Sequence, residues 1–294
     1  MPKATVKLIV TGDDFGYCPR RNQGIVECFL AGAVSNVSLL VNGSAVSDAV
    51  QLARRYHIPI GLHANLSEGL PVCPALKEES SLLNKEGFFH GKMGIRTVLA
   101  EGLLKMLAII IVIIYHCLPE IRHVFAQVLE EYGIIHTRVP IEPDLPHCSW
   151  IDPHLMDFYL GVEKDSLDTV DVFTKHGIRW PDIYIGLSTM GKNMSMSNIL
   201  RAIDNATTDF LAKENASIPS SSPSCPDQGI RTVTIELMTH PGYPSVPPVG
   251  GCGEGPDDFS QSWERLHELK TLKNPELQSH YETRNIQLCA FKDL

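Results

Sequence analysis

Two adjacent carboxylates, Asp13 and Asp14, follow a stretch over 6–10 in which every residue except Lys7 is aliphatic. An apolar stretch of this kind predicts a strand buried on both faces, with both carboxylates at its carboxyl end. In α/β folds, ligands bind at that end of the strands. One carboxylate is then able to bind a cation while the other accepts a proton. The alternative is an ordinary turn over 12–16, because Asp and Gly are common turn residues.

Four further polar residues stand at or just beyond the ends of other predicted strands: His63, His116, Arg138 and His240. If the strands are parallel neighbours, these side chains and the two aspartates converge on one rim. An Asp and His ligand set suits Zn²⁺, Mn²⁺ or a partly hydrated Mg²⁺. Such a metal polarises a carbonyl and activates water, while a carboxylate acts as general base and a histidine as general acid. The pattern favours hydrolysis of an amide or ester.

Each of these residues also has a simpler interpretation. A single histidine is more often a hydrogen-bonded structural residue than a ligand, and the chain has 12 of them. Arg138 could pair with a core carboxylate instead of contacting a substrate.

The first sixty residues alternate between apolar strand patterns and helical patterns. Strands are predicted over 6–10, 36–41 and 58–62, and helices over 22–31 and 45–56. This alternation predicts right-handed crossovers and a parallel sheet. Later strands are predicted over 106–115, 133–139, 183–187, 233–238 and 286–290, and later helices over 119–132, 152–176, 195–210 and 258–272. The 294 residues suit one α/β domain of the usual size of a β/α barrel.

Two segments are expected to lie outside the regular elements. Residues 67–98 contain several Pro and Gly and are predicted to form a lid or substrate wall. The Ser/Pro-rich residues 217–228 are predicted to form a flexible surface excursion.

The composition limits the possible partners. A net charge of −9 argues against general binding to nucleic acid or to an anionic membrane. The apolar run over 106–115 is shorter than the ~20 residues that span a bilayer, so it is predicted as a buried strand, with a membrane anchor as the alternative. The chain shows no signal-peptide pattern and its eight cysteines form no CxxC pair, so a cytoplasmic protein with reduced thiols is expected.

Five blocks of the sequence are long and specific: TGDDFGYCPRRNQGI at 11–25, LLVNGSA at 39–45, GLHANLSEGLPV at 61–72, ELMTHPGYPSVPP at 236–248 and GGCGEGPDDFSQSWERLHEL at 250–269. With these blocks the chain resembles the YdjC-type carbohydrate deacetylases over nearly its whole length. The resemblance implies a (β/α) barrel-like fold related to polysaccharide deacetylases. It also implies Mg²⁺-dependent removal of N-acetyl groups from acetylated amino-sugar oligosaccharides, with Zn²⁺ or another divalent ion as the alternative.

The resemblance also implies roles for individual residues. Asp13 corresponds to the catalytic proton acceptor, Asp14 and His63 correspond to metal ligands, and His240 matches a histidine near the site. We expect His240 to share in catalysis and Arg138 to contact the substrate. The oligomeric state is left open.

One block departs from the family pattern. The family has a histidine-rich block, Asp-Gly/Ser-His-x-His-x-His, shortly before a proline, whereas residues 110–119 read IIVIIYHCLP. The expected third ligand position falls on Val112, and the segment near 92–116 is shortened. His116 is the one remaining histidine and is taken as the third ligand, although four residues of an ideal strand span roughly 13 Å. The alternative is a non-catalytic relative that keeps the sugar cleft, or an aberrant isoform with impaired metal binding.

Overall fold

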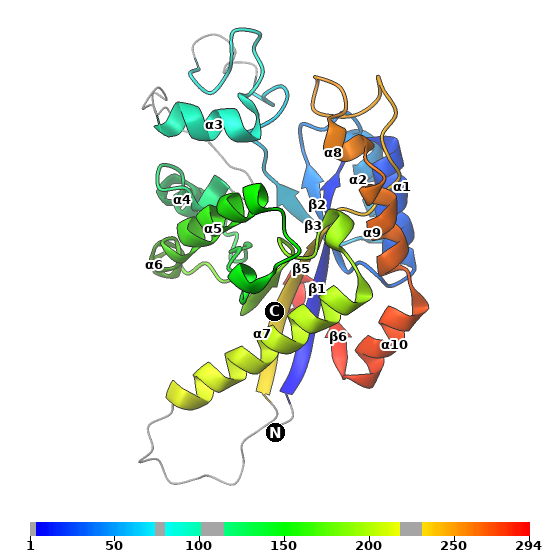
Figure 1. Ribbon diagram of the computed structural model, residues 1–294. Coiled ribbons are helices and arrows are strands. Elements are labelled where there is room, and N and C mark those ends of the chain that lie inside the picture. Colours follow the sequence, from blue (N-terminus) through cyan, green and yellow to red (C-terminus); the bar gives the residue numbers. More distant parts are fainter. Residues whose placement is uncertain (1–3, 74–79, 101–114, 218–230) are drawn as a thin grey trace.

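A parallel sheet forms the centre of the computed structural model, which describes residues 4–73, 80–100, 115–217 and 231–294. The strands in these ranges are β1 (Ala4–Phe15), β2 (Asn36–Leu40), β3 (Ile60–His63), β4 (Ile183–Ile185), β5 (Arg231–Thr239) and β6 (Ile286–Leu288). Their order is β3-β2-β1-β5-β4, and β6 pairs with the amino-terminal half of β1. The fold is α/β and barrel-like, and the described strands leave the sheet open between β3 and β4 (Figure 1).

The longest strand, β1, runs through the middle of the sheet. Leu8, Ile9 and Val10 are fully buried, as the apolar stretch predicts. The strand extends beyond the predicted range and includes both aspartates. Its register against β2 shifts between Gly12 and Phe15. An irregularity of this kind re-aims side chains at a strand end.

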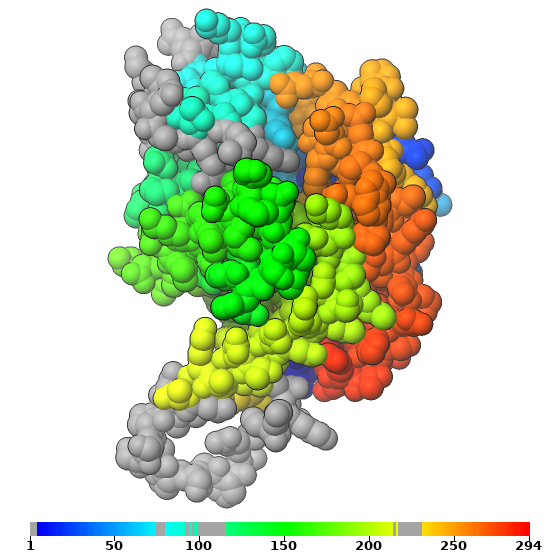
Figure 2. Space-filling model, viewed as in Figure 1, coloured from blue at the N-terminus to red at the C-terminus, as the bar shows by residue number. Residues whose placement is uncertain are grey.

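Helices pack on both sides of the sheet (Figure 1). On one side lie α1 (Pro19–Leu30), α2 (Val46–Tyr56), α9 (Glu264–Leu272) and α10 (Pro275–Thr283). The other side carries α4 (Arg122–Glu131), α5 (Pro153–Leu167) and α6 (Val170–Lys175). The remaining helices are α3 (Gly91–Ala100), α7 (Met196–Ser217) and α8 (Asp258–Gln261). In the space-filling view, α5 and α7 lie on the near face of the molecule (Figure 2). No helix within the described residues has the length and apolar character needed to cross a bilayer.

Several predicted boundaries are wrong. The loop predicted over 67–98 ends in helix α3, which forms around the fully buried Ile95. The helix predicted over 152–176 divides into α5 and α6 near Thr169, whose hydroxyl bonds to the carbonyls of Asp165 and Cys117. The helix predicted over 258–272 also divides into two helices, α8 and α9. Helix α10 was not predicted.

The strand predicted over 133–139 does not form in the described structure. His136 makes a single bridge to Arg179, and no ladder continues from it. Residues 134–138 line one side of a cavity of about 460 Å³. The cavity reaches across to β3, where Ile60 and Leu62 are about half exposed.

Two other predicted segments lie almost entirely outside the described residues. The predicted strand 106–115 lies outside the described residues except for Tyr115, which begins a short 3₁₀ helix, Tyr115–Cys117. The predicted excursion 217–228 also lies outside them except for Ser217, the last residue of α7.

A buried carboxylate holds the loop after β4. Glu142 accepts hydrogen bonds from the backbone N–H groups of Gly186, Leu187 and Ser188 and from the Ser188 hydroxyl. Burial raises the pKa of Glu142 to about 7, although these hydrogen bonds oppose the rise. Because the folded pKa exceeds the unfolded value, this group stabilises the fold at low pH, and the contribution is lost as the pH rises through about 7.

We expect Glu142→Gln to remove this pH dependence. Between pH 5 and 8 the stability of the wild type should fall relative to the variant by on the order of 2 kcal/mol. Thermal or urea unfolding at both pH values measures the change, and the exposed Glu131→Gln on α4 is the control. An equal pH response in the wild type and Glu142→Gln would contradict the expectation.

Candidate active site

Asp13 lies at the carboxyl end of β1 and is almost fully buried, with 1% of its surface exposed. The Ser38 hydroxyl on β2 donates to Oδ1 at 2.6 Å. The Arg138 guanidinium donates to Oδ2 at 2.7 Å and to Oδ1 at 3.2 Å. Burial raises the pKa of Asp13, but Arg138, with smaller contributions from His63 and Ser38, holds it below its ordinary value. Asp13 is therefore an ionised carboxylate at neutral pH.

Arg138 binds a second buried carboxylate on the neighbouring strand. Glu236 on β5 accepts from Arg138 Nη2 at 2.7 Å and from Arg138 Nε at 3.0 Å. The Thr11 hydroxyl donates to the same oxygen of Glu236. The guanidinium thus bridges two carboxylates, which is the interpretation that the sequence offered as the alternative to a substrate contact. Together the three groups carry a formal charge of −1.

Asp14 points to a different set of partners. Its backbone has a positive φ of 64°, a conformation that few residues other than Gly adopt and that is often found at functional sites. Its carboxylate receives a hydrogen bond from Arg21 Nη1 at 3.2 Å and lies 3.7 Å from His63 Nε2. His63 Nδ1 lies 3.0 Å from the Ser38 hydroxyl, which also contacts Asp13. Ser38 therefore connects the two aspartates through His63.

His116 is packed in the core beside Arg138. Its Nε2 lies 2.7 Å from the Arg138 carbonyl oxygen, and its ring contacts those of Phe125 and Phe173. Within the described residues, no group of three His, Cys, Asp or Glu side chains is arranged to hold a metal ion. The structure therefore brings Asp14 and His63 together as the sequence predicts and does not bring His116 to them. Two protein donors do not complete the expected three-ligand site.

We expect His116→Phe to act on stability and not on metal binding. The substitution keeps an aromatic ring against Phe125 and Phe173 but removes the partner of the Arg138 carbonyl. Leaving a buried acceptor unpaired costs about 1–3 kcal/mol, which unfolding experiments measure. Titration with Mg²⁺ and Zn²⁺ should give the same affinity as for the wild type, whereas His63→Ala should weaken it. A loss of metal affinity in His116→Phe would make His116 a ligand after all.

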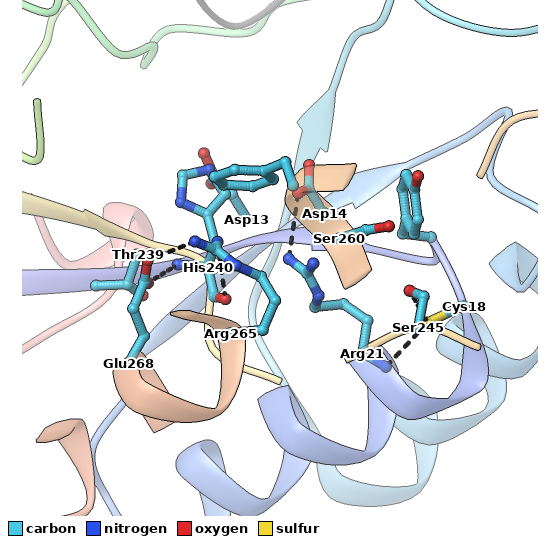
Figure 3. A network of polar contacts seen from close by, with 12 residues as sticks. Asp13, Asp14, Cys18, Arg21, Thr239, His240, Ser245, Ser260, Arg265 and Glu268 are labelled. Atoms are coloured by element: carbon cyan, nitrogen blue, oxygen red, sulfur yellow. Dashed lines mark hydrogen bonds and ion pairs between the residues drawn. The ribbon is translucent and has the colours of Figure 1, made fainter. Parts of the chain in front are cut away.

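His240 follows β5 directly, and helices α8 and α9 surround it. Its backbone N–H donates to Glu268 Oε2, and its carbonyl accepts from Arg265 Nη1 at 3.3 Å. Its ring packs edge-on against Phe259, with 5.2 Å between ring centroids. In the close view, the helix that carries Arg265 and Glu268 lies below His240, while Asp13 and Asp14 lie on the side of His240 away from that helix (Figure 3).

The sequence did not single out five buried residues of this network: Arg21, Ser38, Glu236, Arg265 and Glu268. A signal was present for Glu236, since it is a charged residue within an apolar strand, where a buried partner is required. Arg265 and Glu268 are spaced i, i+3 on a helix and are able to pair, but exposed helix faces carry the same pattern. The contacts of Ser38 with Asp13, of Glu236 with Arg138 and of Glu268 with His240 join residues that are 25 or more positions apart.

A parallel α/β fold with two aspartates and two histidines at its strand ends defines an enzyme-like site. A sequence model of the family described as YdjC-like protein matches residues 7–109 and 114–283. The chain belongs to this family. The matched stretches leave out residues 110–113, which include Val112, the position predicted for the third ligand.

The chain is similar over its full length to vertebrate proteins named carbohydrate deacetylase. It is 56% identical to the protein from Xenopus laevis, with 98% of each chain covered, and 55% identical to that from Danio rerio, with 100% of each covered. A chitooligosaccharide deacetylase from Yersinia pestis is 23% identical, with 97% of this chain and 98% of that protein covered.

A solved structure shares the fold. It belongs to a protein from Enterococcus faecalis V583 described in connection with cellobiose-phosphate cleavage. The TM-score is 0.58 at 20% sequence identity, with 99% of each chain covered. At this level of identity the likeness concerns the fold alone.

Proposed function

We propose that this chain hydrolyses the N-acetyl group of acetylated amino-sugar oligosaccharides. The observation that carries the proposal is the position of Asp13, a buried carboxylate at the end of the central strand that shares the Ser38 hydroxyl with His63 and stands next to Asp14. Full-length similarity to proteins named carbohydrate deacetylase supports the choice of substrate.

In the proposed reaction, Asp13 accepts a proton from a water molecule as the water oxygen bonds to the acetyl carbon. His240, in its protonated form, then gives a proton to the sugar nitrogen as the bond between carbon and nitrogen breaks. The products are acetate and a free amine. Arg138 keeps Asp13 ionised through its two hydrogen bonds, and Ser38 fixes the orientation of the carboxylate. Arg138 is then a positioning residue, because its guanidinium donors are directed to Asp13 and Glu236.

We also propose that Asp14 and His63 are the place where a divalent cation would bind, Mg²⁺ first and Zn²⁺ or another ion as the alternative. The described residues contribute two donors, which do not make up a three-ligand site. We therefore expect weak binding and derive no step of the reaction from the metal. Metal titration of the wild type, Asp14→Asn and His63→Ala tests whether these two residues bind it.

Mass spectrometry of the products tests the proposed reaction. The purified chain is incubated with N-acetylated chitooligosaccharides in the presence of Mg²⁺, and the products are analysed for loss of acetyl groups and for chain length. Loss of acetyl groups at unchanged chain length is the expected result. Shorter oligosaccharides that keep their acetyl groups would contradict the proposal and indicate glycosidic cleavage.

A second candidate is a sugar-binding relative, or an aberrant isoform, that does not release acetate. Two observations favour it. The apolar residues 110–113 lie outside the stretches that the family model matches, and the described residues provide no third metal donor beside Asp14 and His63. Calorimetric binding of the oligosaccharide without acetate release would favour this candidate. The cytoplasm stays the expected location, to be tested by cell fractionation.

A further inference from the structure

The main chain of His240 is held by an ion pair that is fully buried. Arg265 and Glu268 on α9 are both 0% exposed, and Arg265 Nη2 lies 3.2 Å from Glu268 Oε1. Glu268 accepts from the N–H of His240 with its other oxygen, and Arg265 donates to the carbonyl of His240. Both polar backbone groups of one residue are therefore bound by the two members of one ion pair.

The same two residues fix the surroundings of His240. Glu268 Oε1 also accepts from the N–H of Gly191 at 2.7 Å, which ties the segment after β4 to the segment after β5. The Arg265 carbonyl accepts from the N–H of Gly242 at 3.1 Å. The Arg265 guanidinium lies 3.6 Å from the centre of the Phe259 ring, which in turn packs against the His240 ring.

A purely structural role does not account well for this arrangement. Removing two charges from water is costly, and a buried ion pair is often no more stabilising than apolar residues of the same size. Hydrogen bonds from charged groups are, however, roughly twice as strong as those between neutral groups. His240 has left the β-ladder, so its buried N–H and carbonyl need other partners, and charged partners bind them more strongly than neutral ones.

From this geometry we propose that Arg265 and Glu268 are positioning residues that hold His240 in place to donate a proton to the leaving amine. The inference rests on the proposed function in one respect, since it takes His240 as the proton donor. A displacement of about 1 Å in a reacting group lowers rates by roughly 100-fold, so a rigid main chain at this position has a direct kinetic value.

The test compares Glu268→Gln with the matched control Glu264→Gln. Glu264 lies on the same helix and is 3.7 Å from the same arginine, but no described contact joins it to His240. Gln at position 268 keeps the shape of the side chain and loses its charge, so only one of its two terminal atoms is left as an acceptor. We expect kcat for acetate release to fall about 10- to 100-fold in Glu268→Gln, with KM within about twofold of the wild type. Glu264→Gln should keep both constants.

A second variant separates positioning from folding. Arg265→Ala should lose activity, and millimolar guanidinium chloride should restore part of it, whereas sodium chloride at the same ionic strength should not. A general loss of folded protein would not respond in this way. Equal losses in Glu268→Gln and Glu264→Gln, or no difference between guanidinium and sodium in Arg265→Ala, would overturn the proposal.

Hydrogen exchange of the peptide around His240 gives a readout that needs no substrate. Amide exchange over residues 239–242 should be about tenfold faster in Glu268→Gln than in Glu264→Gln. If the wild type releases no acetate, the proposed function fails, and the exchange data still decide whether the ion pair holds His240. Unchanged exchange in Glu268→Gln would overturn the positioning role in either case.

Discussion

Asp13→Asn is expected to lower the rate of acetate release by roughly 10²- to 10⁴-fold, the usual contribution of a general base. An amide at this position keeps the size of the side chain and still accepts a hydrogen bond, but it cannot accept a proton from water. Steady-state kinetics on an N-acetylated chitooligosaccharide measure the effect. Because Arg138 holds the pKa of Asp13 low, the acid limb of the wild-type profile should lie below the ordinary range of an aspartate.

Ser38→Ala is the matched control for this variant. It removes the 2.6 Å hydrogen bond to Asp13 and the 3.0 Å contact with His63 Nδ1, but it leaves the carboxylate and both bonds from Arg138 in place. We expect a loss of about tenfold or less, because the proton acceptor itself is kept and only the hydrogen bonds of a neutral hydroxyl are removed. Asp13→Asn with the activity of the wild type would exclude Asp13 as the base.

Arg138→Met is expected to have the largest effect on stability. The substitution leaves Asp13 and Glu236 buried without the cation that both of them bind. Removing one partner from a buried ion pair costs about 3–5 kcal/mol, so a marked fall in the midpoint of thermal unfolding is expected.

The loss of stability in Arg138→Met should become larger as the pH rises. In the wild type the lowered pKa of Asp13 contributes stability at neutral pH, which is lost as the pH falls through the folded pKa. Without Arg138, burial raises the pKa of Asp13, so the variant loses stability as the pH rises. Calorimetry at pH 5 and pH 8 should show the smaller difference from the wild type at pH 5. The double variant Arg138→Met/Glu236→Leu removes one of the two carboxylates that Arg138→Met leaves without a cation, so it should recover part of the lost stability. A double variant as unstable as Arg138→Met would contradict this account.

The order of the first strands and helices could be predicted from the sequence because local patterns determine it. The aliphatic residues at 6 and 8–10 are buried in the central strand, and Asp13, Asp14 and His63 lie at strand ends as predicted. The glycines and prolines over 67–98 predicted a loop, but helix α3 begins there at Gly91 and packs through the fully buried Ile95.

The partners of the predicted residues could not be read from the sequence. Arg138 and Asp13 are 125 positions apart, and only the fold brings them within hydrogen-bond distance. The same holds for Glu236, which shares this arginine from a third segment of the chain. A pattern shows that a charged residue stands at a strand end, but whether it meets substrate or another charge depends on the packing of distant elements.

The role of His116 also depends on residues that are distant in the sequence. It is the one histidine in its block, and its place in the sequence suggested a metal ligand. In the fold its ring packs against two phenylalanines and its Nε2 contacts a carbonyl, both of which are features of a core histidine. A histidine surrounded by aromatic residues distant in sequence cannot be recognised as such before the fold is known.

The most direct test of the central claim is the time course of acetate release from N-acetylated chitobiose by the purified wild-type chain, measured enzymatically in the presence of Mg²⁺. The proposed site predicts acetate that accumulates in proportion to enzyme concentration and over many turnovers. A folded wild-type chain that binds the sugar and releases no acetate would contradict it.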